Sequence, residues 1–293
     1  MKLMTQYLLD TYSVNDLNQA FSNGYKAGLA SDSKNVLDAR NTLKSVRKAY
    51  GLSESVTDIL TKPESNLKLA KADKPSYGLT LYHYVFKSRL NDKLILNLCP
   101  NAGDCTKVCV IENGHGSRPS TQLAWRWRSD LLAHHANDFM ILLGWELARA
   151  IIKHGSILVR PNVNSDIQWE KIVPSMVDGS VTGDSITYYG YTKIPEYLNG
   201  DGDITSHYRV CYSYNENSPA WGGIYPFIKR GGSVAIVTNR KPKTDIKQWS
   251  HYKVIDVDLT DEWIFQKGVI GDMSAKGKAI NLIGKSGFVT NAY

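Results

Sequence analysis

The chain has 293 residues, of which 42% are hydrophobic and 22% are charged. This composition is typical of a globular protein and excludes collagen-like, coiled-coil and wholly disordered chains. Lys and Arg number 35 against 28 Asp and Glu, and the resulting net charge of +7 permits an anionic partner such as nucleic acid without identifying one.

No run of about 18 apolar residues occurs, so we expect no membrane-spanning helix and no membrane partner. Residues 1–10 lack the long apolar core and the small-residue cleavage site of a signal peptide. We therefore expect a cytoplasmic protein. In such a reducing compartment, clustered cysteines bind metals more often than they form disulfides.

Residues 1–75 are predicted to form a helical N-terminal extension and linker. Ser13 is a suitable cap for one helix, and Gly51 stands where a glycine is expected to end another. A short further helix is expected over residues 53–60. The charged, proline-bounded segment 62–76 is weakly apolar and predicts a linker or an extended arm.

From residue 76 to 293 short apolar runs alternate with helical patterns. Strands are predicted over residues 93–98, 156–160, 185–189, 207–212, 232–238 and 253–257. Helices are predicted over residues 120–154 (with a break near His134), 166–177, 194–198 and 221–229. This alternation predicts an α/β fold, a partial (βα)6 barrel-like parallel sheet with a helical N-terminal extension. An open doubly wound sheet is the alternative, because periodicity does not distinguish the two.

Ligands of parallel α/β proteins bind beyond the carboxyl ends of the strands, so the polar residues that follow each strand are the candidates for a site. In chain order they are Cys99, Cys105 and Cys109, then Asn162, Asn164 and Asp166, then Tyr191 and Lys193, then Ser213, Asn215 and Glu216, and finally Asn239 and Arg240.

Cys99, Cys105 and Cys109 form a C-x5-C-x3-C array in a single loop. Soft thiolate ligands favour an iron–sulfur cluster or zinc. Zinc normally takes a fourth protein ligand, for which Cys211 and His115 are the candidates. We expect a [4Fe–4S] cluster whose fourth iron is open, with zinc and three unrelated thiols as the alternatives.

Three further residues are predicted to be catalytic and four to bind substrate. Asp166 is either a general base or the N-cap of a short helix. Lys193 is suited to stabilising an oxyanion or an anionic substrate, and Asn164 to donating a hydrogen bond into the site. The predicted substrate-binding residues are Asn162, Ser213, Asn215 and Glu216.

Several motifs resemble those of a tailed-phage family called gene product eighty-eight. They are Cys99-Pro-Asn-Ala-Gly103 through Cys109, Gly114-His-Gly116, Arg160-Pro-Asn-Val-Asn-Ser-Asp-Ile-Gln-Trp-Glu170, Tyr191-Thr-Lys193, Tyr212-Ser-Tyr-Asn-Glu-Asn217, Ala275-Lys-Gly-Lys-Ala279 and Ser286-Gly-Phe-Val289. The resemblance spans residues 77–290 in the same motif order. It implies a phage origin and therefore the cytoplasm of an infected bacterial cell.

A looser similarity is to radical S-adenosylmethionine enzymes, which also place a three-cysteine loop after the first strand of a six-unit partial barrel. The spacing differs from their C-x3-C-x2-C pattern, and Asn162-Val-Asn164 stands where their Gly-Gly-Glu stretch would be. The similarity therefore extends to the fold better than to the cofactor.

The expected function is that of an iron–sulfur enzyme, a hydrolase or lyase whose open iron acts as a Lewis acid on a small carbonyl or ester-type substrate. One alternative is a radical enzyme that binds S-adenosylmethionine on the same cluster. The other is a non-catalytic iron–sulfur or zinc protein that binds DNA or a host protein.

Overall fold

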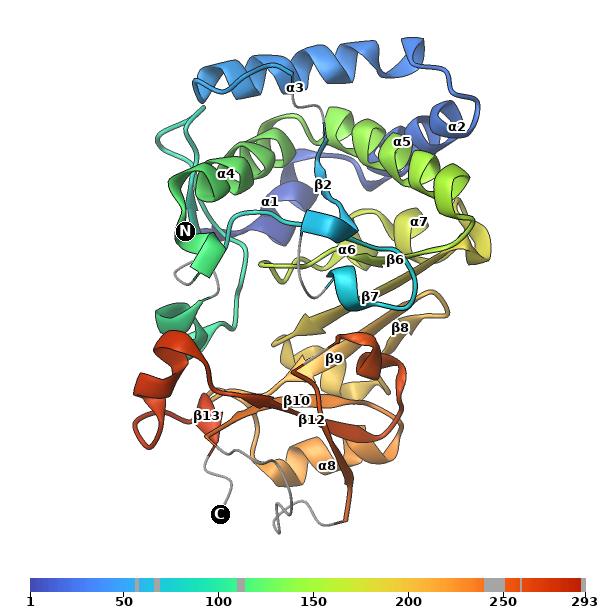
Figure 1. Cartoon of the computed structure of the whole chain (residues 1–293). Helices are drawn as coiled ribbons and strands as arrows, with labels where there is room; N and C mark the ends of the chain where they lie inside the picture. The colour runs from blue at the N-terminus through green and yellow to red at the C-terminus, as the bar shows by residue number, and fades with distance from the viewer. Residues whose placement is uncertain (56–57, 66–68, 110–113, 240–250, 259, 291–293) are drawn as a thin grey trace.

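A computed structural model describes the whole chain except residues 56–57, 66–68, 110–113, 240–250, 259 and 291–293. At one end of the molecule the N-terminal helices and two long central helices pack together, and at the other end lie the last strands with helix α8 (Figure 1). A mostly parallel sheet runs between the two ends and carries the candidate site at one edge.

The large sheet has ten strands among the described residues. Eight of them follow the order β11 (Lys253–Asp256), β12 (Val269–Ser274), β10 (Val234–Thr238), β9 (Tyr208–Ser213), β7 (Ile186–Thr192), β6 (Ile157–Arg160), β3 (Ser76–Leu79) and β2 (Leu60–Thr61). The other two, β13 (Val289–Thr290) and β8 (Asp203–Thr205), pair with β10 and β9. All pairs are parallel except β2 with β3 and β8 with β9.

A second sheet of three strands carries the cysteine loop. Its order is β1 (Lys2–Leu3), β5 (Ile95–Asn97) and β4 (Val85–Lys87), with β5 parallel to β1 and antiparallel to β4. The strand predicted over residues 93–98 therefore exists, but its placement as the first strand of the large sheet was wrong. The apolar alternation that identified it does not specify its partner strands.

The helices lie largely where the sequence predicts them. Their bounds are α1 (Met4–Thr11), α2 (Val14–Leu29), α3 (Leu37–Ala49), α4 (Pro119–His134), α5 (Ala136–His154), α6 (Trp169–Ile172), α7 (Pro174–Val177) and α8 (Trp221–Lys229). The Ser13 side chain accepts a hydrogen bond from the Asp16 amide and caps α2. Gly51 has a φ of +68° after the end of α3, as the sequence predicts. The helix expected over residues 53–60 is absent from the described part of that segment, where Leu60 begins β2.

The α/β class and the parallel sheet are confirmed, whereas the barrel is not. Over the described residues the sheet is open, with β11 at one edge and the antiparallel β2 at the other. Five strands that the sequence did not reveal, β2, β3, β8, β12 and β13, also belong to it. The predicted first strand pairs in the smaller sheet instead.

Helices α2 and α5 cross at glycines that allow their backbones to touch. A Cβ atom at Gly24 would lie 2.0 Å from the carbonyl oxygen of Ile141, and one at Gly144 would lie 2.3 Å from that of Phe21. The core beside this crossing contains the fully buried Phe21, Trp127 and Phe139, so residues of the predicted extension and of the following segment share one core. The division into domains at residue 75 stays a prediction.

Glu146 on α5 binds the segment that leads into β2. Its carboxylate accepts hydrogen bonds from the amides of Ile59 and Leu60 at 2.8 and 2.9 Å. Burial raises the pKa of Glu146 to about 8, from an ordinary value of 4.5. The native protein therefore retains a proton here over a pH range in which the unfolded chain has released it.

The proton retained on Glu146 makes the free energy of unfolding depend on pH. The stabilisation is complete below the unfolded pKa and is lost as pH rises through the folded value, so we expect the free energy of unfolding to fall by up to roughly 4 kcal/mol between about pH 5 and pH 8. Urea titrations at several pH values measure it. A Glu146→Gln variant should lose most of the slope, and an unchanged slope would contradict the assignment.

Within the described ranges, no helix combines the length and the apolar character needed to cross a bilayer.

Candidate functional site

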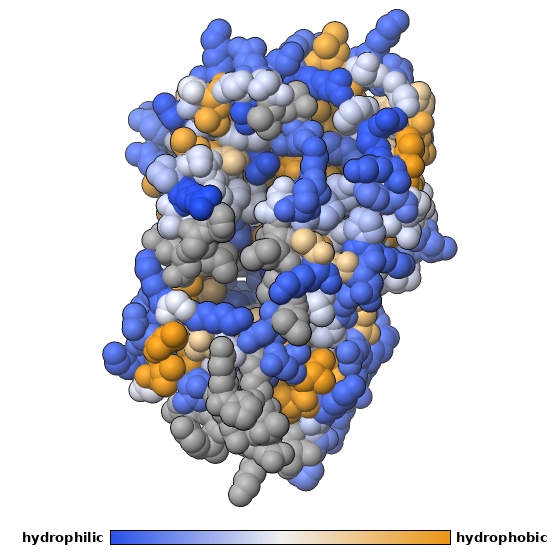
Figure 2. All heavy atoms as spheres, in the orientation of Figure 1, coloured by the Kyte–Doolittle hydropathy of each residue, from blue (hydrophilic) through white to orange (hydrophobic). Residues whose placement is uncertain are grey.

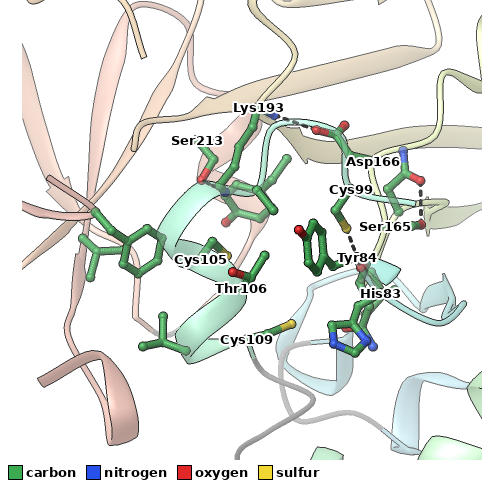
Figure 3. A pocket seen from close by; sticks show the side chains of 18 of the residues that line it. His83, Tyr84, Cys99, Cys105, Thr106, Cys109, Ser165, Asp166, Lys193 and Ser213 are labelled. Atoms are coloured by element: carbon green, nitrogen blue, oxygen red, sulfur yellow. Dashed lines mark hydrogen bonds between the residues drawn. The ribbon is translucent and has the colours of Figure 1, made fainter. Parts of the chain in front are cut away.

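A cavity of about 540 Å³ lies where the cysteine loop meets the carboxyl ends of the central strands (Figure 3). In Figure 3 the three cysteines, Asp166, Lys193 and Ser213 surround the same space. On the face drawn in Figure 2, the surface is hollowed between the two ends of the molecule. The residues that line the cavity are His83, Tyr84, Cys99, Ala102, Cys105, Thr106, Val108, Cys109, Arg160, Asn162, Val163, Asn164, Ser165, Asp166, Tyr191, Thr192, Lys193, Ser213, Val237, Met273, Ser274, Lys276, Ala279 and Phe288.

The convergence of the polar loops on one rim is confirmed for three neighbouring strands. Asn164 follows β6, Lys193 follows β7 and Ser213 ends β9, and these three strands are parallel and adjacent. Parallel strands bring their carboxyl ends to one edge, which is why residues distant in sequence meet here. The cysteine loop reaches the same edge from the smaller sheet instead.

The three cysteines are half-buried and none forms a disulfide. Cys99 follows β5, Cys105 lies on the 3-10 helix η4 (Gly103–Val108), and Cys109 is the residue that ends this helix. The Cys99 thiol donates to the carbonyl oxygen of Asn164 at 3.1 Å. Burial, and then the nearby charge of Asp166, raise the pKa of Cys99 well above its usual range, so this thiol keeps its proton in the protein without metal.

Asn215 and Glu216 lie behind the cysteine loop and hold it, and neither lines the cavity. The side-chain amide of Asn215 donates to the carbonyl oxygen of Asn101 at 2.9 Å. The Glu216 carboxylate accepts a hydrogen bond from the Asp104 amide. Their predicted role in substrate binding stays a prediction, and the contacts instead give them a role in shaping the loop.

Gly103 allows the contact between the Glu216 carboxylate and the Asp104 amide. Its φ is +52°, and a Cβ atom there would lie 1.9 Å from Oε1 of Glu216. A Gly103→Ala variant is therefore expected to displace the cysteine loop and to cost about 1–3 kcal/mol of stability. Urea unfolding measures the cost, and the reactivity of the three thiols toward a disulfide reagent reports the displacement. A variant with unchanged stability and thiol reactivity would show that the loop does not need this glycine.

Asp166 lies on the cavity wall beside Cys99. One carboxylate oxygen accepts the Lys193 amide at 2.8 Å, and the Thr192 side chain also hydrogen-bonds to it. Burial raises the pKa of Asp166 to about 6, which suits a general base at near-neutral pH. The alternative that Asp166 caps the next helix is wrong, because α6 begins after Gln168.

Lys193 and Ser213 touch within the cavity. The Lys193 Nζ lies 2.7 Å from the Ser213 Oγ, and both residues line the wall. The close-up in Figure 3 shows the lysine extending from the end of its strand toward this serine.

Asn162 and Asn164 differ in how their side chains are used. The Asn162 amide oxygen accepts hydrogen bonds from Ser165, from the Ile167 amide and from the Trp169 indole, and its nitrogen donates to the carbonyl oxygen of Ile167. These bonds organise the turn after β6, and the role of Asn162 in binding substrate stays a prediction. By contrast, the Asn164 Nδ2 is buried and has no hydrogen-bond partner among the described residues. Because Asn164 lines the cavity, this amide nitrogen is a candidate donor for a bound molecule.

The thiol donors on the cavity wall are three cysteines among the described residues. Across the described part of the chain, no three His, Cys, Asp or Glu side chains lie close enough together to share one ion. Zinc requires ligands at about 2.0–2.3 Å and hence a tight group. Iron–sulfur clusters are held by thiolates, and the three thiols around this cavity are donors of that chemical type.

Of the two candidates for a fourth zinc ligand, Cys211 does not join this group. Cys211 is fully buried in β9 and does not line the cavity, in agreement with its interpretation as a small core residue. The side chain of His115 lies outside the described part of the chain. Arg240, one of the candidates after the fifth predicted strand, also lies outside it.

The sequence did not reveal part of the wall. Among the missed residues are His83, Tyr84 and Arg160, and on the C-terminal side Val237, Met273, Ser274, Lys276, Ala279 and Phe288. Arg160 is paired with Asp261 at 2.7 Å and positions the wall. Lys276, Ala279 and Phe288 fall within the C-terminal motifs quoted for the family, which was the one signal that could have located them. No pattern in the sequence marked His83 and Tyr84.

The fold and the cavity together define an open, mostly parallel α/β protein with a three-cysteine site at the carboxyl edge of its sheet. A family model described as gene product 88 matches residues 58–291. The chain therefore belongs to the gene product 88 family, and the resemblance to that phage family is confirmed. Comparison with curated proteins and with solved structures found no match. The similarity to radical S-adenosylmethionine enzymes is not supported, and the cysteine loop does not follow a strand of the large sheet as it does in those enzymes.

Proposed function

We propose that this chain is a phage-encoded iron–sulfur enzyme, a hydrolase or lyase for a small carbonyl or ester-type substrate, that acts in the cytoplasm of the infected cell. A [4Fe–4S] cluster would be held by Cys99, Cys105 and Cys109. The observation that carries this proposal is that all three thiols and the candidate acid–base side chains line one cavity. Its volume of about 540 Å³ lies within the range of small-molecule sites.

When bound, the cluster would supply a Lewis acid at its open iron. The residues of the chain supply the remaining chemistry. Asp166, with its pKa of about 6, is ionised at neutral pH and can accept a proton from water or from substrate. The Asn164 Nδ2 can donate to a substrate oxygen. The apolar wall formed by Val237, Met273 and Phe288 limits the access of water.

Purification under nitrogen followed by iron and sulfide analysis tests the proposal. We expect about four irons and four sulfides per chain, with broad absorption near about 400 nm. Colourless protein with one zinc per chain would overturn it. Reductive cleavage of S-adenosylmethionine by the reduced protein would replace the Lewis-acid mechanism with the radical one.

A further inference from the structure

Lys193 and Ser213 are brought together by the large sheet itself. Strands β7 and β9 are parallel neighbours in which Thr192 pairs with Tyr212, so the next residue of each strand lies side by side. Ser213 is only 8% exposed, and Lys193 is half-buried. Their side chains meet at 2.7 Å between Nζ and Oγ, and both line the cavity. This is the distance expected between a nucleophile and its base.

The contacts of the lysine side chain direct it to the serine. In the described part of the chain, the one printed side-chain hydrogen bond of the Lys193 Nζ is to the Ser213 Oγ. The Asp166 carboxylate on the same cavity wall interacts electrostatically with Lys193, and the dyad requires the amine form of the lysine. A serine hydroxyl needs such a base beside it, because it is a weak nucleophile on its own.

We propose that Ser213 and Lys193 form a nucleophile–base dyad for acyl transfer in this cavity. The Ser213 Oγ would attack the carbonyl carbon of an ester as its proton passes to the neutral Lys193 Nζ. The C–O bond to the alcohol then breaks, and the alcohol leaves with that proton, so that an ester of Ser213 remains. Water attacks this ester with the same lysine as base, which releases the acid and restores the hydroxyl.

Two other parts of the cavity fit an acyl substrate. The unpartnered Asn164 Nδ2 supplies a donor for the carbonyl oxygen, whose negative charge increases during the attack. Apolar side chains of the C-terminal strands and of the segment after them, Val237, Met273, Ala279 and Phe288, line the cavity as well. The substrate class is therefore an ester with a small apolar acyl group. This inference rests on the proposed function for its carbonyl or ester substrate, but the dyad itself requires no metal.

A fluorophosphonate probe tests the dyad on the purified full-length chain. Its phosphorus is attacked by an activated serine and fluoride leaves, so a stable adduct forms. We expect one adduct per chain, mapped by peptide mass spectrometry to Ser213. Ser213→Ala, Lys193→Met and the permanently charged Lys193→Arg should each lower the rate about 100-fold or more. Asn164→Ala should lower it about 10-fold or more.

Lys267→Met is the matched control. Lys267 binds Asp203 at 2.6 Å on the surface, outside the cavity, so this variant should label at the wild-type rate. The dyad would be overturned if Ser213 of the wild-type chain formed no adduct, or if the labelling rate of Lys193→Met were unchanged. The first of these results does not depend on the folding of any variant. Iron analysis of the same samples separates the two proposals. Labelled Ser213 without iron would overturn the cluster alone, whereas iron without labelling would overturn the dyad alone.

Discussion

Replacement of Cys99, Cys105 or Cys109 by Ser is expected to abolish iron and sulfide binding, whereas replacement of Cys211 by Ala is expected to preserve it. The three thiols that line the cavity are the only thiols on its wall among the described residues. A hydroxyl is a much poorer ligand for iron than a thiolate, so each single variant removes one of the three proposed protein ligands.

Cys211 provides the matched control because it is the fourth thiol of the chain, is fully buried in β9 and does not reach the cavity. The measurement is iron and sulfide per chain after anaerobic reconstitution, with circular dichroism to show that each variant is folded. We expect values near the background for the three cavity variants and near the wild-type value for Cys211→Ala. Equal iron in all four variants would show that the metal, if present, is bound elsewhere.

A Gly144→Ala variant is expected to lower the free energy of unfolding by about 3 kcal/mol or more. The new Cβ would lie 2.3 Å from the Phe21 carbonyl oxygen and 2.7 Å from the Tyr25 amide nitrogen, and both are backbone atoms of α2. A side chain could turn aside, but here a whole helix must move, and the buried Phe21 must move with it. Overpacking a close-packed core in this way costs about 1–3 kcal/mol and sometimes more.

Gly222→Ala on α8 is the control, because it makes the same replacement of glycine by alanine without a steric clash. A Cβ there would meet nothing within 4 Å, so this variant should stabilise the chain by about 0.5–1 kcal/mol through the unfolded state. Urea unfolding of the two variants gives the comparison. Equal stability of the two would show that α2 and α5 do not cross at these glycines.

The elements with a strong apolar pattern could be predicted from the sequence. The run from Ile157 to Arg160 and that from Val234 to Thr238 are continuous apolar stretches with polar ends, and both became central parallel strands. The helix break near His134 separates α4 from α5 as expected. Such apolar patterns identify the residues that are buried, both in the strands of the sheet and in the helices.

Strand β12 could not be recognised in the same way. Its sequence contains Gly271 and Asp272, which are typical of loops. In the structure a Cβ at Gly271 would collide with the Trp263 ring, and Asp272 accepts a buried hydrogen bond from Thr238. Both residues are explained only by neighbours on other elements, Trp263 on the preceding 3-10 helix and Thr238 on β10. The strand over residues 93–98 was recognised, but its partners β1 and β4 could not be inferred from its own residues.

The candidate site was predicted best where it follows a parallel strand. Topology alone places Asn164, Lys193 and Ser213 at one edge, and the motif spacing places the cysteines in one loop. The Asn162 amide is used within the turn, whereas the Asn164 Nδ2 has no partner among the described residues. This difference could not be predicted, because it depends on the turn geometry around Trp169. The Lys193–Ser213 contact was likewise hidden, since it depends on the register of two strands.

Later parts of the chain hold the cysteine loop in place. This determines the order in which the site can assemble. Glu216, which accepts the Asp104 amide, is synthesised more than a hundred residues after Cys99, and the cavity wall is complete only with Phe288. Contacts of such long sequence separation form late in folding, because a long loop must close first. During synthesis the three thiols therefore emerge from the ribosome well before their enclosure exists. Cofactor loading would then be a step that follows completion of the chain, with the final residues closing the wall last.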